Sequence, residues 1–317
     1  MPDSILLIAT DEAGYGPKLG PLVIVATAWK IPKLPEEQWD DLFEPLRAGF
    51  VFNGKRIVVN DSKAVYKAGD GLHSLHAAVS ASHQWCGRTE KHVGEILPAI
   101  APNDVKAIED TPWLSGFDQQ PFLDASETLG LLSHWRSTGI EQSNVLARVI
   151  TAQSFNAACD KGYNKADLLS ESTLGLVRSL LERHTEEQVA VFCDRHGGRR
   201  YYGGVLQHTF PDIPVQVTSE EKGMSRYCLS GAKRSIDVRF TVKGDSFTPV
   251  AMSSLHAKYL RERMMGSFNS FFQKLHDGKE PIVPTAGYPV DADRFLVDVE
   301  PILKREKIDR EQLIRSR

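Results

Sequence analysis

Four acidic side chains stand at or near the ends of apolar segments, where a strand would fix the direction in which they point. They are Asp11, Glu12, Asp194 and Asp245. Carboxylates that converge repel one another, and their pKa values rise unless cations lie between them. Hard divalent ions take oxygen ligands, and Mg2+ recruits substrate phosphate. The pattern therefore indicates a divalent-metal site for a phosphate compound, although each acid taken alone is an ordinary residue for a strand end or turn.

A glycine-rich turn follows the first acidic pair, in the segment DEAGYGPKLGP. Gly14 and Gly16 carry no β-carbon, so a ligand has room to approach the backbone closely beside the acids. The same glycines would also serve the tight turn of a β-hairpin. On the residues alone, both interpretations stay open.

The composition is that of a folded protein with one large domain or two small ones. The chain has 317 residues, of which 41% are hydrophobic and 25% charged, and its mean hydropathy is −0.28. These values exclude a disordered or low-complexity chain. The formal net charge is −3, so any contact with nucleic acid must come from a local basic patch.

The four cysteines are scattered without the CxxC spacing of a zinc site, and they form no recognisable disulfide framework. They indicate a reducing compartment. The apolar stretch at residues 22–29 is much shorter than the roughly 20 residues that a membrane helix needs. The first residues lack the basic region of a secretory signal. We therefore expect a cytoplasmic protein without a membrane segment.

Short apolar or alternating runs predict the strands that would position the acids. These runs are residues 4–10, 22–29, 55–60, 188–193, 213–218 and 236–242. The first two lie so close together that they predict an antiparallel hairpin. Apolar residues at helical spacing predict helices at 72–85, about 125–136, 167–184 and 251–276, and the charged tail 304–317 is compatible with one more. Strands followed by alternating helices and strands predict an α/β fold with a mixed sheet.

The segment DEAGYGPKLGPLVIVA closely resembles DEAGRGPLAGPVVAAA, the opening motif of prokaryotic type 2 ribonucleases H. Further segments resemble that family in the same order: NDSKAVY, VAVFCDRHGG, VKGDSFTPVAMSSLHAKYLRERMM and TAGYPV. The five motifs are spread over residues 5–290, and their shared order is more specific than any one of them. Residues of about 88–150 have no counterpart in the family pattern and contain several prolines, so we expect an insertion or cap there.

The resemblance implies a ribonuclease H-like fold with a mixed five-stranded sheet flanked by helices. Residues 1–250 would form the catalytic core, and 251–317 a C-terminal helical region packed on it. On the family pattern Asp11, Glu12, Asp194 and Asp245 are the catalytic residues and hold two Mg2+ or Mn2+ ions. The implied reaction cuts the RNA strand of RNA–DNA hybrids, or ribonucleotides embedded in duplex DNA, and leaves 3′-hydroxyl and 5′-phosphate ends. Two metal ions suit this hydrolysis because they activate water and stabilise the leaving oxygen.

The resemblance also implies a set of nucleic-acid contacts. The residues concerned are Gly14, Tyr15, Gly16, Ser62, Lys63, Lys258, Arg261 and Tyr288. The backbone of the glycine-rich turn would sense the 2′-hydroxyl, the group that distinguishes RNA from DNA, and Tyr288 would lie against the adjacent sugar. Phosphate contacts are expected from the other four. Lys258 and Arg261 are three residues apart and share a helix face, which without the motif would be interpreted as a solvated face.

The chain departs from the family pattern in three of its motifs. Tyr15 replaces an arginine, which leaves the preference for a single embedded ribonucleotide open. Arg195 and His196 follow the third acid, where the family usually has glycine. A proton shuttle or a phosphate contact is one interpretation of His196, but we expect it exposed in a loop whose Arg199 and Arg200 face phosphate. Thr285 and Ala286 replace a His-Lys pair.

Two alternatives remain beside the metal-dependent endoribonuclease. One is a structure-selective nuclease of the same fold that acts on DNA or other RNA, because one fold hosts several chemistries. The other is a non-catalytic nucleic-acid-binding module with residues 88–150 as its docking surface. Four retained acids argue against a simple binder, since unneutralised negative charge repels phosphate. A monomer is expected.

Overall fold

The computed structural model describes residues 4–61, 65–66, 71–115, 119–232, 234–278 and 280–316. Its centre is a seven-stranded sheet with the order β5-β2-β1-β6-β9-β8-β7. The strands of this sheet are β1 (Ser4–Ala13), β2 (Leu22–Pro32), β5 (Glu141–Ile150), β6 (Gln188–Asp194), β7 (Val215–Glu220), β8 (Met224–Ser230) and β9 (Ser235–Thr241). A separate hairpin consists of β3 (Phe50–Phe52) and β4 (Lys55–Ile57).

The sheet is mixed, and its parallel part lies at the centre. β1 pairs antiparallel with β2, which confirms the expected hairpin, and parallel with β6. β6 in turn pairs parallel with β9. Thr10 lies opposite Cys193 in this register, so the carboxyl ends of β1 and β6 meet at one edge of the sheet. That edge is where acids at the two strand ends come together.

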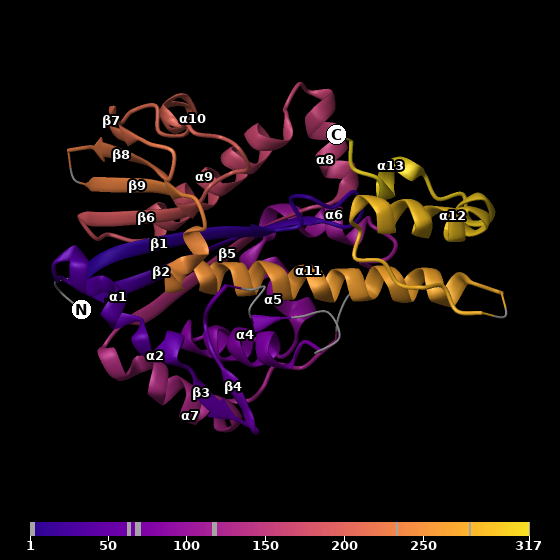
Figure 1. The fold of residues 1–317 in the computed structure, drawn as a ribbon, viewed down its shortest axis with the longest axis horizontal. Helices are drawn as coiled ribbons and strands as arrows, with labels where there is room; N and C mark the ends of the chain where they lie inside the picture. The colour runs from indigo at the N-terminus through magenta and orange to yellow at the C-terminus, as the bar shows by residue number, and fades with distance from the viewer. Residues whose placement is uncertain are drawn as a thin grey trace.

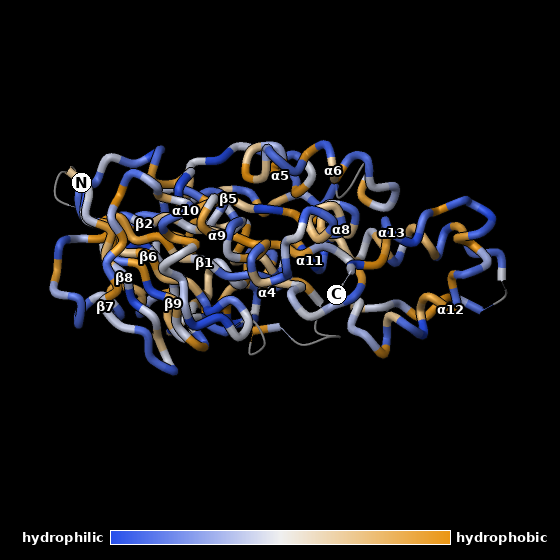
Figure 2. Tube along the Cα trace, turned by 90° about the horizontal axis from the view of Figure 1, so that it is seen from above, coloured by the Kyte–Doolittle hydropathy of each residue, from blue (hydrophilic) through white to orange (hydrophobic). Residues whose placement is uncertain are grey.

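Helices cover both faces of the sheet (Figure 1). One face carries α8 (Ala152–Asp160), α9 (Lys165–Arg183) and α10 (Gly203–Thr209), and the other carries α4 (His73–Trp85), α7 (Ala125–Trp135) and α11 (Thr248–Leu275). β1 is buried on both sides because Leu6 and Ile8 face the α9 layer while Leu7 and Ala9 face the α11 layer. Apolar residues therefore run along the strands inside the molecule (Figure 2).

Shorter helices complete the chain, and α12 lies against the far half of α11. They are α1 (Trp39–Leu42), α2 (Glu44–Ala48), α5 (Val93–Ile100), α6 (Val105–Glu109), α12 (Pro289–Glu306) and α13 (Arg310–Leu313). The described residues also form the 3-10 turns η1 (Glu36–Gln38), η2 (Pro102–Asp104), η3 (Arg136–Thr138) and η4 (Gly244–Ser246). Among the described residues, no helix combines the length and apolar character that crossing a bilayer requires.

The expected α/β class with a mixed sheet and flanking helices is confirmed, but the sheet has seven strands instead of five. Residues 55–60 do not join it, because β4 pairs with β3. The region expected as an insertion ends in β5, which pairs with β2 and belongs to the sheet. β8 was not expected, since its buried Ser225, Tyr227 and Leu229 give a weak apolar pattern. The domain boundary at residue 250 stays a prediction.

Candidate active site

Three of the four predicted acids meet at the edge where β1 and β6 end. Ligand oxygens of Asp11, Glu12 and Asp194 all lie within 4.8 Å of one another. Asp11 and Glu12 lie inside β1, which continues to Ala13 through its pairing with β2, and do not follow the strand as expected. The strand fixes the directions in which Asp11 and Glu12 point.

Burial and mutual repulsion favour the protonated forms of these acids when no cation is present. Burial, and then the charge of Asp194, raises the pKa of Asp11 to about 8. Burial and the charge of Asp11 raise the pKa of Glu12 well above its ordinary value. Hydrogen bonds from Ser254 and from the backbone N–H of Glu12, the latter 2.8 Å long, oppose the shift of Asp11. A set of oxygen ligands that repel one another in this way suits a divalent cation.

Asp245 lies in η4, directly after β9, and is half-buried. It is not a member of the close group of three, although its charge adds to the raised pKa of Asp11. The Gly244 N–H donates to Asp194 Oδ1 at 2.7 Å and ties η4 to the end of β6. Lys243 adopts the left-handed conformation at the preceding turn, with φ of +59°. This strained turn directs η4 toward the acids.

The glycine-rich turn packs against α11 beside the cluster. Gly14 has a φ of +90°, and a β-carbon there would lie 2.5 Å from the Pro21 carbonyl oxygen and 2.6 Å from Arg261 Nε. A β-carbon on Gly16 would meet only the Tyr288 ring, at 3.7 Å. Gly14 is therefore required by the fold, whereas Gly16 leaves open space at the surface.

Replacing Gly14 with Ala is expected to reduce the free energy of unfolding by about 2 kcal/mol or more, because the left-handed conformation is strained for Ala and its β-carbon meets backbone. The matched control Gly16→Ala should change it by less than about 0.5 kcal/mol. Chemical denaturation of both variants measures the difference. Equal stabilities would show that the turn is not held as described.

The spacing of Lys258 and Arg261 alone indicates a solvated helix face, but Arg261 is buried. It is 2% exposed, and Nη2 donates to the Ala286 carbonyl at 2.9 Å. Its guanidinium therefore packs between the glycine-rich turn and the Ala286 carbonyl and does not face solvent. Lys258 is half-buried, lies 2.8 Å from Glu262 and approaches the Tyr66 ring at 5.1 Å. Burial lowers the pKa of Arg261 below its ordinary value.

The segment that carries Tyr288 docks onto the glycine-rich turn through its backbone. The Gly287 carbonyl accepts hydrogen bonds from the N–H groups of Lys18 and Leu19, at 2.7 and 3.1 Å. Thr285, which stands in place of the family histidine, accepts from the Gly287 N–H at 2.9 Å. Tyr288 is 53% exposed, and its ring lies beside Gly16. Ser62 and Lys63 lie outside the described residues.

His196 is buried, so the expectation of an exposed loop histidine is wrong. It is 1% exposed, its Nδ1 lies 2.9 Å from Ser170 Oγ, and its ring packs against Tyr202 and Phe240. Burial, and then the charge of Arg199, lowers its pKa to about 3. A neutral histidine in this position is a packing residue of the α9 layer.

The neighbouring arginines contact protein groups in this structure. Arg199 pairs with Asp167 on α9, and Arg200 donates to the Glu220 carbonyl. Arg195 donates to the Lys222 carbonyl at 2.6 Å. Their expected phosphate-facing role remains a prediction.

Two residues near the acids were not singled out by the sequence. Ser254 hydrogen-bonds Asp11 from α11; it lies within the quoted helix motif, four residues before Lys258, and that spacing could have indicated it. Lys165 is the first residue of α9, and its Nζ lies 4.2 Å from the Tyr15 ring centre. Its positive charge partly opposes the raised pKa of Glu12. No motif marks Lys165, because only the fold brings α9 to this edge.

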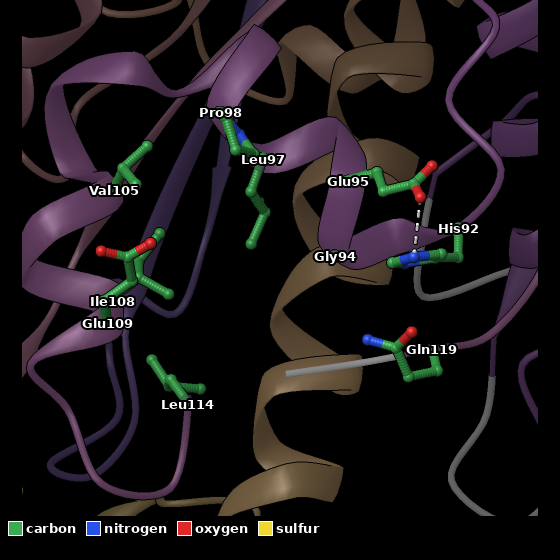
Figure 3. A pocket seen from close by; sticks show the side chains of 10 residues that line it. All are labelled: His92, Gly94, Glu95, Leu97, Pro98, Val105, Ile108, Glu109, Leu114 and Gln119. Atoms are coloured by element: carbon green, nitrogen blue, oxygen red, sulfur yellow. Dashed lines mark ion pairs between the residues drawn. The ribbon is translucent and has the colours of Figure 1, made fainter. Parts of the chain in front are cut away.

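Two hollows in the described part of the structure lie at different distances along the fold from the acids, and none of the four acids lines either of them. One of about 240 Å3 borders the Asp194 end of β6, with Trp39, Phe192, Gly244 and Phe247 in its wall. Another of similar volume lies between α5 and α6 (Figure 3). None of the ten residues that line this second hollow belongs to the carboxylate cluster or to the glycine-rich turn.

No protein-family model and no curated protein sequence matches this chain. Solved structures resemble it at low identity. Ribonuclease H2 from Pyrococcus horikoshii OT3 is 12% identical, with a TM-score of 0.44 over 98% of this chain and 92% of that chain. RNase HII from Archaeoglobus fulgidus, in complex with PCNA, is 13% identical, with a TM-score of 0.44 over 99% and 95%. Bst-RNase HIII in complex with Mn2+ is 12% identical, with a TM-score of 0.41 over 98% and 66%. Likenesses of this size assign no activity to this chain.

Proposed function

We propose that this chain is a divalent-metal-dependent endoribonuclease of the ribonuclease H type, with a ribonuclease H-like fold. Its substrates are RNA–DNA hybrids or duplex DNA with embedded ribonucleotides, and its products carry 3′-hydroxyl and 5′-phosphate ends. The observation that carries the proposal is the meeting of Asp11, Glu12 and Asp194 at the ends of two parallel strands. The five ordered motifs connect that cluster to this reaction.

The three clustered acids, with Asp245 beside them, would hold Mg2+ or Mn2+. When bound, such ions supply an activated water and stabilise charge on the leaving oxygen. The raised pKa values of Asp11 and Glu12 support this role, because their side chains are oxygen ligands that gain from a cation.

The remaining residues would bind and orient the nucleic acid. The backbone of Gly14, Tyr15 and Gly16 would contact the 2′-hydroxyl, and the exposed ring of Tyr288 would lie against the next sugar. Buried Arg261 would act as a positioning residue, since it is 2% exposed, packs against Gly14 and donates to the Ala286 carbonyl. Lys258 and, outside the described residues, Ser62 and Lys63 would contact phosphates.

A panel of three duplexes tests this function: one with a single ribonucleotide in DNA, one long RNA–DNA hybrid and one of DNA alone, each with Mg2+ or Mn2+. Cleavage confined to the first two, with the stated ends, is the expected result. DNA cut at a comparable rate would replace the proposal with a structure-selective nuclease. Binding of all three without cleavage would replace it with a non-catalytic module.

Replacing Tyr15 with Arg is expected to change the ratio of single-ribonucleotide to hybrid cleavage several-fold, because it adds a positive charge beside the scissile phosphate. Tyr15→Phe is the matched control, since it keeps the ring that Lys165 approaches. Cleavage rates of both duplexes give the ratio. A ratio that stays the same in Tyr15→Arg would show that residue 15 does not set substrate preference.

A further inference from the structure

A hollow of about 340 Å3 lies against the glycine-rich turn and carries an uneven distribution of charge. Its described lining includes the cationic side chains Lys18, Lys165 and Arg315 and no aspartate or glutamate. The other lining residues are Gly16, Pro17, Phe155, Pro289 and Ser316. A concave wall of one charge sign concentrates ions of the opposite sign. The hollow is therefore suited to an anion.

Arg315 provides buried donors that have no acceptor in the protein. The residue is 4% exposed, Nη2 donates to the Pro17 carbonyl, and the guanidinium lies 5.5 Å from the Phe155 ring centre. Nε and Nη1 are buried and have no hydrogen-bond partner among the described residues. Buried donors of a charged group are normally bonded, so two unpartnered N–H groups in a residue that lines the hollow indicate a site for an acceptor.

A second buried guanidinium adds to the positive charge at this place. Arg261 is 2% exposed, and its Nε also has no hydrogen-bond partner among the described residues. Burial, and then the positive charge of Arg261, lowers the pKa of Arg315 to about 9. Buried charges are costly unless they are paired, so an anion in the hollow beside Arg315 would offset the cost.

The chain holds Arg315 in place through its backbone. Its N–H donates to the Lys18 carbonyl at 3.1 Å, and the preceding Ile314 forms a bridge with Leu19. Asn156 on α8 donates to the Ile314 carbonyl at 2.8 Å and accepts from the Ser316 N–H at 2.6 Å. These backbone contacts, together with the hydrogen bond from Nη2 to the Pro17 carbonyl, hold the Arg315 guanidinium next to the turn.

We propose that this hollow binds a phosphate group, with an unpartnered N–H group of Arg315 as donor and with Lys18 and Lys165 supplying further positive charge. A guanidinium N–H directs a charge-assisted hydrogen bond at a phosphate oxygen, whereas a lysine acts as a point charge. Lys18 also pairs with the exposed Asp293, which leaves the guanidinium of Arg315 as the specific contact.

The position of the hollow favours a phosphate of the nucleic-acid backbone over a free ion. Gly16 and Lys165 belong to its wall, and Lys165 also lies over Tyr15 and acts on the charge of Glu12. A strand that places its sugar on the glycine-rich turn would therefore bring a neighbouring phosphate to Arg315. This assignment to the backbone rests on the proposed function, whereas phosphate binding itself does not.

The test compares the wild type with Arg315→Met, which keeps a long apolar side chain against Phe155 and removes the donors. A DNA duplex with 5′-hydroxyl ends, in EDTA, reports binding without cleavage. Affinity should fall about 10-fold in Arg315→Met, and the slope of log K against log salt should decrease by about 1. Arg178→Met, which changes an exposed arginine on α9 that pairs with Glu182, should change affinity less than 2-fold. Arg315→Lys should be intermediate, because it keeps the charge and loses the directed guanidinium N–H donors.

Inorganic phosphate, titrated while thermal unfolding is followed, separates the two sources. It should stabilise the wild type more than Arg315→Met if the hollow binds phosphate. Stabilisation that depends on Arg315 without an effect on duplex affinity would overturn the backbone assignment in favour of a free phosphate site. No dependence on Arg315 in either assay would overturn the whole inference. Duplex affinity that depends on Arg315 in a protein that cleaves nothing would support the inference and contradict the proposed function.

Discussion

Replacing Asp194 with Asn should reduce cleavage at least about a thousand-fold, which corresponds to roughly 4 kcal/mol of lost transition-state stabilisation. The substitution removes the charge that a divalent ion needs at the end of β6. It retains the size of the side chain and the Oδ1 acceptor for the Gly244 N–H. Single-turnover cleavage of the single-ribonucleotide duplex measures the effect.

The same variant should keep its fold and its affinity for nucleic acid. Removing the charge of Asp194 relieves its repulsion with Asp11, so the melting temperature should stay the same or rise. Asp212→Asn makes the same chemical change on an exposed acid and is the matched control. Cleavage by Asp194→Asn at the rate of this control would remove Asp194 from the set of metal ligands.

The metal-free protein should lose stability as the pH rises toward 8. The folded-state pKa of Asp11 is about 8, whereas an unfolded aspartate titrates near 3.9. Between these values the folded state binds a proton that the unfolded state has lost, so the free energy of unfolding falls with increasing pH, by a few kcal/mol in total. Mg2+ or Mn2+ should reverse the loss and stabilise more at pH 8 than at pH 5.

Thermal unfolding between pH 5 and 8, with EDTA or with a divalent metal, measures this dependence. Buried His196, whose pKa is lowered to about 3, has the opposite effect, because stability rises until the unfolded histidine loses its proton near pH 6.5. Between pH 7 and 8, the change in stability with pH therefore reports mainly on the clustered acids and not on His196. Asp11→Asn should have a flatter profile there than the wild type. Identical profiles of the two proteins in that interval would contradict the raised folded-state pKa of Asp11.

The sequence predicted the elements whose burial is nearly complete. β1 and β6 are continuous apolar runs because both faces of the central sheet are covered, and their ends located Asp11, Glu12 and Asp194. α11 was predicted from an apolar stripe that packs on β1 and β2. Elements of this kind leave the strongest periodicity in a chain.

The sequence could not predict the features that depend on distant contacts. β5 and β8 carry polar residues and are strands because a neighbouring edge pairs with them. Arg261 has the spacing of a surface residue, yet the glycine-rich turn and the Tyr288 segment cover it. Arg315 is close to the turn only because its neighbour Ile314 pairs with Leu19, nearly three hundred residues earlier. No local pattern records such pairings.

The central claim is that the acids of β1 and β6, with Asp245, hold divalent cations. Anomalous-difference density from a crystal grown with Mn2+ tests it most directly. We expect density within ligand distance, about 2.0–2.2 Å, of carboxylate oxygens of Asp11, Glu12 and Asp194, and a second ion that Asp245 also contacts. Well-ordered carboxylates with no anomalous density among them at saturating Mn2+ would contradict the account.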